Sequence, residues 1–444
     1  MQPTPLALPS SLPDGGRQPQ SATFRGAGEA VRLLHLHHTD FCPWSQSLLK
    51  PTLTRFADVI TLSSTRTADP LAAGIERFVG LEHIEPENLH IRSWGNVADG
   101  ITFTNIFKRG QVLFGKRRAY QRKVAVADFD GVCSSDIYVF ESKNPNKLLP
   151  ELLPFICQSE GFFEYAVKTS AGSLSPRTNW SHLANYEFPL PPVDEQRRIA
   201  DLLWAADDVV QKQNEAHEKL VIVKQATIDA LFTKGVSGKH KKFQTTKLGD
   251  IPEKWNLVKL EDVTIKIVDG VHKRPDYVEV GIPFVTVENL SQSQEIDLEN
   301  ARRITIKDHN EFYKRCNPEK GDVLVTKDGT LGIAKLVKTD EIFSVFVSVA
   351  LLKPERRKLD GRYLKAFFDS SIFKRRLSGK TSGSALKHIH LIDFRSTLFP
   401  LPDLSEQEEI VEILDSIDNQ VDLSISHQHN CSNLKKAILN NSLE

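Results

Sequence analysis

Two long stretches of the chain carry apolar residues at alternating spacings of four and three, the period of a helix that packs along one face. The first spans residues 194–232, follows Pro191-Pro192, and has Asp194 as its expected N-cap. Polar side chains interrupt the stripe, so the pattern predicts a coiled coil with an imperfect seam. The apolar positions are Ile199, Leu203, Ala206, Val210, Leu220 and Leu231 in the first stretch, and Ile410, Leu414, Ile417, Val421, Cys431 and Ile438 in the second.

The segments that precede these helices alternate short β-type runs with turns and helical stretches. Glycine and proline mark the turns between the runs. This mixture predicts an α+β domain or an open β-rich domain before each helix. The clearest β-type runs are 111–114, 137–140, 322–326 and 344–352, and the clearest helical stretch is 362–377.

The domain and its helix occur twice in the chain. Residues 188–203 and 399–414 are identical at 8 of 16 positions, at an offset of 211 residues. The same offset relates residues 109–116 to 320–327, and Gly172-Ser173 to Gly383-Ser384. Nearer the start the offset falls to 206 and then 204, as expected when insertions are confined to loops. The chain is therefore a tandem duplication.

The repeat divides the chain into six segments. The domain at 51–191 is called the first domain below, and the domain at 247–402 the second domain. We expect part of the N-terminal extension to be disordered because it is rich in proline, serine, glycine and glutamine. The segments are the extension 1–50, the first domain 51–191, a helix 192–234, a linker 235–246, the second domain 247–402, and a helix 403–444.

Charge is separated locally although the whole chain is neutral, with 57 basic and 57 acidic residues. Residues 108–123 carry seven bases and no acid, whereas residues 405–424 carry seven acids and no lysine or arginine. Basic loops on the domains favour phosphate contacts, and acidic helices favour contacts with protein.

The helices are long enough to act as spacers. Thirty-nine residues extend about 58 Å, and one turn of DNA is about 34 Å. We predict that the two helices pair antiparallel and hold the domains apart. The alternative is that they only cover the domain cores.

Cysteine use and hydropathy predict a cytoplasmic protein. The five cysteines are scattered and odd in number, which disfavours a disulfide framework. No apolar run is long enough to span a bilayer, so we expect no contact with a membrane. His35, His38 and Cys42 could ligate a metal, but their spacing matches no familiar site and we predict no metal in this chain.

The doubled Phe-Pro-Leu-Pro-(x)3-Glu-Gln-(x)2-Ile motif, each time at the start of a long helix, resembles the specificity subunit of Type I restriction–modification systems. Ile251-Pro-Glu-Lys-Trp255, followed by Leu260-Glu-Asp-Val263, belongs to the same pattern. The resemblance covers residues 51–444. The first domain does not begin with an Ile-Pro-x-x-Trp motif, and residues 1–50 match nothing in the second copy.

The resemblance implies a DNA-recognition subunit that has no catalytic residues. Its two target recognition domains would each read half of a bipartite site in double-stranded DNA, and its helices would form an antiparallel coiled coil. Its partners would be two methyltransferase subunits, which use S-adenosylmethionine, and restriction subunits, which use ATP and Mg. The chain itself would hold no cofactor.

The candidate DNA contacts lie on two loops of each domain. Basic, amide, hydroxyl and imidazole groups can reach phosphates or base edges, and an exposed tyrosine can stack. The same loops could instead be ordinary solvated turns. The candidates are Lys116, Arg117, Arg118, Tyr120, Arg122, Lys123, Arg177 and Asn179 in the first domain, and Lys327, Thr330, Lys387, His388 and His390 in the second.

Two other functions remain as alternatives. Asp130, Glu141 and Lys143 superficially resemble the metal site of a nuclease, but the second copy has no counterpart of the Glu-x-Lys pair. A scaffold whose coiled coil binds only proteins is the other alternative. The helix residues expected to form the helix–helix or partner interface are Ile199, Leu203, Ala206, Val210, Ile410, Leu414, Ile417 and Val421.

Overall fold

The computed structural model describes residues 51–380 and 388–443. Contacts divide the described residues into two compact units, unit 1 with residues 51–204 and 436–443 and unit 2 with residues 205–380 and 388–435. In the described part, no helix is both long and apolar enough to cross a membrane. The predictions for residues 1–50, including His35, His38 and Cys42, and for Lys387 lie outside the described residues.

The two long helices begin in different ways. Helix α6 (Val193–Lys234) starts where the carbonyl of Pro192 accepts the backbone N–H groups of Glu195 and Gln196, both at 2.9 Å. Asp194 therefore lies in the first turn and is not the N-cap, which corrects the sequence prediction. Helix α12 (Leu404–Leu443) has a carboxylate cap, because Asp403 Oδ1 accepts the backbone N–H of Glu406 at 2.9 Å.

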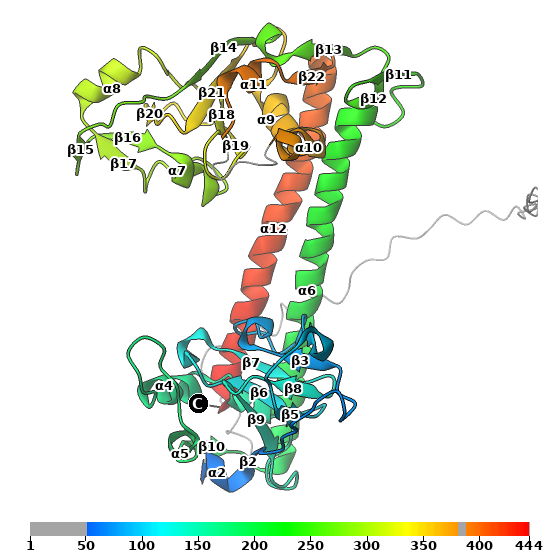
Figure 1. Cartoon of the computed structure of the whole chain (residues 1–444), viewed down its shortest axis with the longest axis vertical. Helices are drawn as coiled ribbons and strands as arrows, with labels where there is room; N and C mark the ends of the chain where they lie inside the picture. Colours follow the sequence, from blue (N-terminus) through cyan, green and yellow to red (C-terminus); the bar gives the residue numbers. More distant parts are fainter. Residues whose placement is uncertain (1–50, 381–387, 444) are drawn as a thin grey trace, which may run out of the picture. The chain divides into compact units, whose positions relative to one another are not determined.

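Unit 1 is built on two four-stranded sheets of short strands (Figure 1). One sheet has the order β2-β9-β6-β7 and is antiparallel throughout; the other has the order β4-β3-β8-β5, with β3 and β8 parallel. A separate antiparallel pair, β1-β10, leads into α6. The strands are β1 (Thr52–Arg55), β2 (Ile60–Leu62), β3 (Arg77–Val79), β4 (Gly95–Asn96), β5 (Asn105–Phe107), β6 (Val112–Gly115), β7 (Val124–Val126), β8 (Gly131–Cys133), β9 (Ile137–Ser142) and β10 (Glu187–Leu190); the helices are α2 (Phe56–Val59), α3 (Leu153–Ile156), α4 (Glu160–Lys168) and α5 (Trp180–Leu183).

Unit 2 repeats the topology of the first sheet and varies that of the second. Its sheet β14-β21-β18-β19 corresponds to β2-β9-β6-β7, and its sheet β15-β17-β16-β20 again contains one parallel pair, β16 with β20. The pair β13-β22 corresponds to β1-β10, and a hairpin β11-β12 follows α6. The strands are β11 (Phe243–Thr246), β12 (Gly249–Pro252), β13 (Asn256–Lys259), β14 (Thr264–Asp269), β15 (Tyr277–Val278), β16 (Ile282–Val285), β17 (Arg302–Ile304), β18 (Val323–Thr326), β19 (Ala334–Leu336), β20 (Ser344–Val345), β21 (Val349–Pro354) and β22 (Leu398–Leu401); the helices are α7 (Val287–Ser291), α8 (Ile306–Phe312), α9 (Gly361–Asp369), α10 (Ser371–Lys380) and α11 (Leu391–Arg395).

Two predicted elements of unit 2 are each divided in the structure. The run 344–352 forms two strands in different sheets, since the backbone N–H of Val349 turns back to the carbonyl of Phe346 at 3.0 Å. The stretch 362–377 forms two helices, α9 and α10. Ser370 separates them with an extended backbone, and its hydroxyl accepts the N–H of Phe373 at 3.4 Å. Apolar periodicity alone does not reveal either break.

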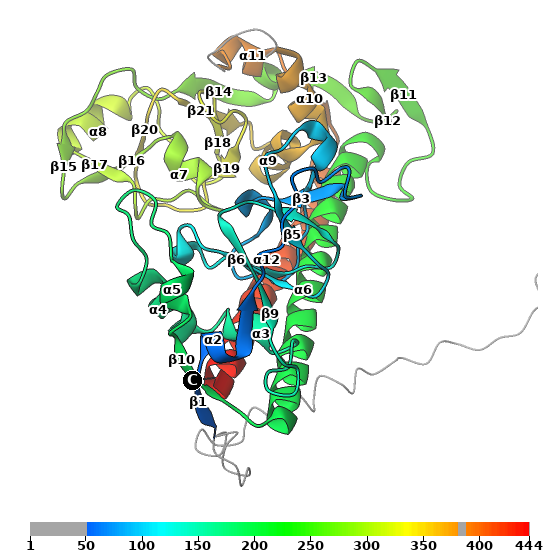
Figure 2. The same cartoon turned by 60° about the horizontal axis from the view of Figure 1, so that its bottom comes forward.

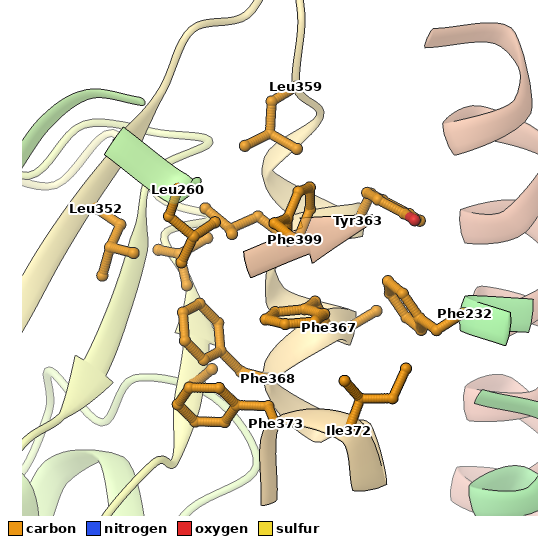
Figure 3. Packing of buried hydrophobic residues seen from close by; sticks show 14 of the residues in the cluster. Phe232, Leu260, Leu352, Leu359, Tyr363, Phe367, Phe368, Ile372, Phe373 and Phe399 are labelled. Atoms are coloured by element: carbon orange, nitrogen blue, oxygen red, sulfur yellow. The ribbon is translucent and has the colours of Figure 1, made fainter. Parts of the chain in front are cut away.

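The core of unit 2 is aromatic and includes the end of α6 (Figure 3). Phe232 stacks on Tyr363 with ring centroids 4.8 Å apart, and Phe367 meets Phe399 at 4.9 Å. The Tyr363 hydroxyl donates to the carbonyl of Pro400 at 3.0 Å, so its one polar atom is satisfied within the core.

Each helix contributes one end to the core of each unit. In unit 1, the start of α6 and the last residues of α12 share one buried cluster; in unit 2, the end of α6 and the start of α12 do the same. The helix residues in the unit 1 core are Ile199, Ala200, Leu203, Leu439 and Leu443, and those in the unit 2 core are Ile228, Leu231, Phe232, Ile410, Val411 and Leu414.

The Glu-Gln step of the repeated motif joins each helix to its domain. Gln196 is buried, and its amide oxygen accepts the backbone N–H of Leu149 at 2.8 Å. Its amide nitrogen donates to the carbonyls of Lys147 and Pro191, both at 2.8 Å. Gln407 makes the same three contacts 211 residues later, with the N–H of Asp360 at 2.8 Å and the carbonyls of Lys358 and Pro402 at 2.9 and 3.0 Å.

Within unit 2, α6 and α12 lie side by side in both views (Figures 1 and 2). Lys224 Nζ lies 2.5 Å from Asp418 Oδ1, and Lys435 Nζ lies 2.6 Å from Asp207 Oδ1. The residue numbers of the paired residues rise along α6 while they fall along α12, so the helices run antiparallel in this stretch. The two ion pairs are equivalent, since the repeat relates Asp207 to Asp418 and Lys224 to Lys435.

The seam of the helix pair is more polar than its sequence stripe predicts. In the fully described stretches 205–227 and 415–434, the buried side chains are those of Asp207 and Ser424, and Lys435 follows directly. Four of the predicted seam residues, Ala206, Val210, Ile417 and Val421, are only half-buried. Buried polar groups in a helix pair contribute pairing specificity at the expense of stability.

We expect Lys435→Met to lower the free energy of unfolding by about 3–5 kcal/mol, because Asp207 would stay buried without the ammonium that faces it. The double variant Asp207→Leu with Lys435→Met should unfold at nearly the wild-type urea concentration. The neighbouring Lys436 is exposed, so Lys436→Met is the matched control and should change stability by less than about 1 kcal/mol. If Lys435→Met and Lys436→Met lowered the free energy of unfolding equally, the buried pair between Asp207 and Lys435 would not be the cause.

Candidate nucleic-acid interface

The two loops of the first domain that carry the candidate residues lie against each other. Two backbone hydrogen bonds join the loop after β6 to the loop before α5. Thr178 N–H donates to the carbonyl of Lys116 at 2.9 Å, and Arg118 N–H donates to the carbonyl of Pro176 at 2.7 Å. The loop before α5 is therefore fixed to the loop after β6. Their basic side chains form one cluster.

The second domain joins the equivalent loops in the same way. Ile389 N–H donates to the carbonyl of Lys327 at 2.8 Å, at positions 211 residues after Thr178 and Lys116. The bridge between Asp328 and His388 likewise corresponds to the bridge between Arg117 and Arg177. Both domains thus use one backbone framework and place different side chains on it.

Asp136 organises the loop pair of the first domain. Its side chain is 15% exposed, and Arg177 Nε donates to its Oδ1 at 3.0 Å while Arg117 Nη1 donates to its Oδ2 at 3.4 Å. The nearby Lys116 ammonium lies 4.6 Å from the ring centroid of Tyr138, and burial lowers the pKa of this lysine. The sequence gives no sign of Asp136, because it comes from the turn between β8 and β9.

Arg118 is held in a conformation that disfavours a side chain. Its φ is 55°, in the left-handed region, and the equivalent residue of the second domain is Gly329, with φ 68°. A non-glycine residue there costs roughly 1 kcal/mol. Arg118 is exposed, so its guanidinium lies at the surface of the loop cluster. Strained backbone of this kind is often found at functional sites.

Three further candidates of the first domain lie at the surface. Tyr120 is 55% exposed, and Asn179 and Arg177 are also exposed. With Arg118, they give this face a stacking ring, an amide and two guanidinium groups. These groups can all contact a nucleic acid without moving the core.

Two basic candidates of the first domain have structural partners. Arg122 pairs with Glu87 at 3.3 Å and Glu160 at 2.8 Å, and its guanidinium lies 4.6 Å from the ring of Phe163. Lys123 Nζ donates to a backbone carbonyl, that of Leu81, at 2.6 Å. These contacts give Arg122 and Lys123 a role in the stability of the loop.

Lys327, a candidate of the second domain, also has structural partners. Its side chain is 5% exposed, and its ammonium lies 3.1 Å from Asp328 Oδ2 and 3.8 Å from Asp269 Oδ2. A lysine so placed contributes to the stability of the loop. The sequence pattern did not reveal Asp269, which lies at the end of β14 and also binds Arg315.

Among the described candidates of this second loop pair, Thr330, His388 and His390 are exposed. His388 Nδ1 contacts Asp328 Oδ1, and the rings of His388 and His390 lie 4.4 Å apart. Partial burial opposes ionisation of Asp328, but hydrogen bonds from His388 and Lys327 keep its pKa below the ordinary value. The second domain thus offers imidazole and hydroxyl groups where the first offers guanidinium groups.

The residues considered for a nuclease have separate partners. Lys108 Nζ donates to Asp130 Oδ2 at 2.9 Å, whereas Glu141 Oε2 accepts from Gln111 at 2.8 Å, and Lys143 donates to the carbonyl of Ala57. Among the described residues, no three histidine, cysteine, aspartate or glutamate side chains are grouped so that they could hold a metal ion.

Comparisons with known proteins agree on one family. A family model described as the Type I restriction modification DNA specificity domain matches residues 98–220 and 252–429, more than half of the chain. The MjaVIII specificity subunit of Methanocaldococcus jannaschii is 27% identical over 387 residues, 85% of this chain and 84% of that protein. The EcoBI specificity subunit of Escherichia coli is 28% identical over 277 residues, 58% of this chain and 57% of that protein.

The fold also has a solved counterpart. A chain from a structure that describes complex assembly and conformational transition of the Type I R-M system aligns with a TM-score of 0.58 and 21% identity. The alignment covers 88% of this chain and 97% of that chain.

Arg122→Ala and Arg118→Gly should distinguish a residue that stabilises the loop from an exposed residue of the same loop. We expect Arg122→Ala to lower the free energy of unfolding by about 1–2 kcal/mol at neutral pH, because it removes the ion pairs and the contact with Phe163. Arg118→Gly should stay within about 1 kcal/mol of wild type, because glycine relieves the strain. Urea unfolding measures both.

The effect of Arg122→Ala should depend on pH. The hydrogen bond from Arg122 holds the pKa of Glu160 below its ordinary value. The pair therefore stabilises the fold above pH about 4.3 and loses this effect as pH falls through the depressed pKa. The difference in the free energy of unfolding between wild type and Arg122→Ala should therefore become smaller in acid. A difference that became larger in acid would contradict a stabilising pair between Arg122 and Glu160.

Proposed function

The chain belongs to the Type I restriction–modification DNA specificity family, and on that premise we propose that its two domains each read one half of a bipartite site in double-stranded DNA. One observation carries the proposal: the same pair of loops meets at equivalent positions of both domains, with guanidinium groups on one and imidazole groups on the other. A shared framework with different exposed side chains is what two recognition domains with different target sequences require.

The chain acts in this proposal as a recognition subunit and supplies no catalytic group. Methylation and cleavage belong to partner subunits. We propose two methyltransferase subunits, which would use S-adenosylmethionine, and restriction subunits, which would use ATP and Mg. The strongly acidic start of α12 offers a charged surface for these protein contacts, and the basic loops remain for DNA.

We further propose that α6 and α12 separate the two half-sites. A helix of 42 residues extends about 63 Å, which exceeds one DNA turn of about 34 Å. The ion pairs Asp207–Lys435 and Lys224–Asp418 support the idea, because a spacer needs a defined register.

The alternatives make different demands. A nuclease would need Asp130, Glu141 and Lys143 to act together, but each contacts a different partner. A scaffold that binds only proteins would leave DNA affinity of the complex independent of salt, whereas phosphate contacts must weaken as salt rises. Salt titration of the complex therefore separates the scaffold from the recognition subunit.

Methylation mapping tests the function directly. In cells that carry the methyltransferase partner, modified bases should fall in one two-part motif with a fixed gap, and only when this subunit is present. Sequencing that detects methylated bases gives the motif. Methylation at sites with no common motif would contradict the proposal, because specificity would then not come from this chain.

Shortening both helices tests the spacer role. We expect deletion of residues 212–218 together with 423–429 to shorten the gap in the motif by about three base pairs, since one heptad is about 10.5 Å and base pairs rise about 3.4 Å. The deletions are equivalent in the repeat and keep both lysine–aspartate pairs aligned. Both half-site sequences should stay unchanged; an unaltered gap would exclude the spacer role.

A further inference from the structure

One arginine of the first domain is held by a carboxylate in a way that leaves its outer edge open. Arg177 Nε donates to Asp136 Oδ1 at 3.0 Å, and Nη2 donates to Asp136 Oδ2 at 3.5 Å. This side-on geometry uses one edge of the planar guanidinium. The end of the fork, formed by Nη1 and the second hydrogen of Nη2, is not needed for Asp136. Arg177 is 54% exposed, so that end can meet a ligand.

Asp136 is itself fixed in position. Its backbone carbonyl accepts the N–H of Lys116 at 3.0 Å, and its own N–H donates to Ser134 Oγ at 3.2 Å. Arg117 reaches Asp136 from another side, and its Nε donates to Ser175 Oγ at 2.6 Å. With only 15% of the Asp136 side chain exposed, this carboxylate is a rigid support for Arg177.

Two parallel N–H donors in a rigid plane match one base edge in the major groove. Guanine presents two acceptors there, O6 and N7, whereas adenine presents an acceptor beside a donor. Fixing the guanidinium before binding also reduces the side-chain entropy lost in the complex. The chemistry of the free edge therefore favours guanine over the other bases.

We propose that Arg177 reads a guanine in the half-site of the first domain, and that Asp136 is the positioning residue that aims it. This inference rests on the proposed function. Arg117 and Lys116 complete the support of the cluster and do not read bases.

The second domain has a different reader at the equivalent position. His388 stands where the repeat places Arg177, and its Nδ1 contacts Asp328, which stands where the repeat places Arg117. A carboxylate thus orients the side chain in both domains, but an imidazole offers a single outward nitrogen rather than a fork. The guanine requirement set by Arg177 accordingly belongs to one half-site only.

The test pairs a protein variant with a base analogue. Duplexes that carry the methylated motif's sequence are prepared with 7-deazaguanine in place of each guanine of the first half-site, one at a time, which removes the N7 acceptor. At one position, the complex of the full-length subunit with its methyltransferase partner should bind roughly tenfold or more weakly. With Arg177→Ala, the unmodified duplex should bind that much more weakly, and the analogue should add almost no further loss.

Further variants separate reading from folding. Arg177→Lys keeps the charge but not the fork, so it should lose the effect of the analogue while it keeps the wild-type dependence on salt. Asp136→Asn should reduce the analogue's effect, because Arg177 would be less well held. His388→Ala is the matched control and should leave the first half-site unaffected. A purely structural Arg177 would shift the unfolding temperature and leave the analogue's effect intact.

The outcomes distinguish this inference from the proposed function. If wild type shows a bipartite motif and Arg177→Ala retains the full effect of 7-deazaguanine at every position, Arg177 does not read guanine and the proposed function stands. A first half-site with no guanine on either strand would also overturn the inference. If wild type yields no bipartite motif, the proposed function fails first.

Discussion

The architecture depends on one side chain that occurs twice, the glutamine in the first turn of each long helix. Gln196 and Gln407 each satisfy one backbone donor and two carbonyls of the domain beside them, in the same pattern. Because a buried amide must satisfy all its polar atoms, the contact defines the angle at which the helix leaves its domain. No apolar residue could specify that angle through hydrogen bonds.

Specialisation of the two domains follows from a framework that tolerates exchange at the loops. Arg118 occupies a backbone position that Gly329 occupies more easily, and Arg122 has a left-handed φ as Gly332 does. In the first domain, the exposed guanidinium of Arg118 comes with backbone strain. In the second domain, Gly329 forms the equivalent turn without that strain. At this loop pair, the two domains thus differ in side chains and local strain, while the equivalent backbone hydrogen bonds from Thr178 and Ile389 remain.

The sequence predicted the features that repeat and missed those that depend on distant partners. Helix periodicity and the duplicated motif are visible along the chain, so both long helices and the equivalent loops that carry the candidate residues were predicted. Asp136 was missed because it approaches the loops from another turn, and the burial of Lys327 beside Asp269 was missed because local charge does not reveal it. The break at Ser370 was missed because one hydroxyl that caps the next helix leaves no periodic signal.

The ends of the helices have a consequence for synthesis of the protein. Leu439 and Leu443 belong to the core of unit 1, whose other members begin near residue 56. As the ribosome releases the chain, the first domain therefore remains without part of its core until residues 439–443 have been translated. A chain cut short before Leu439 would carry an intact second domain and an incomplete first one, and its exposed apolar surface would mark it for proteolysis.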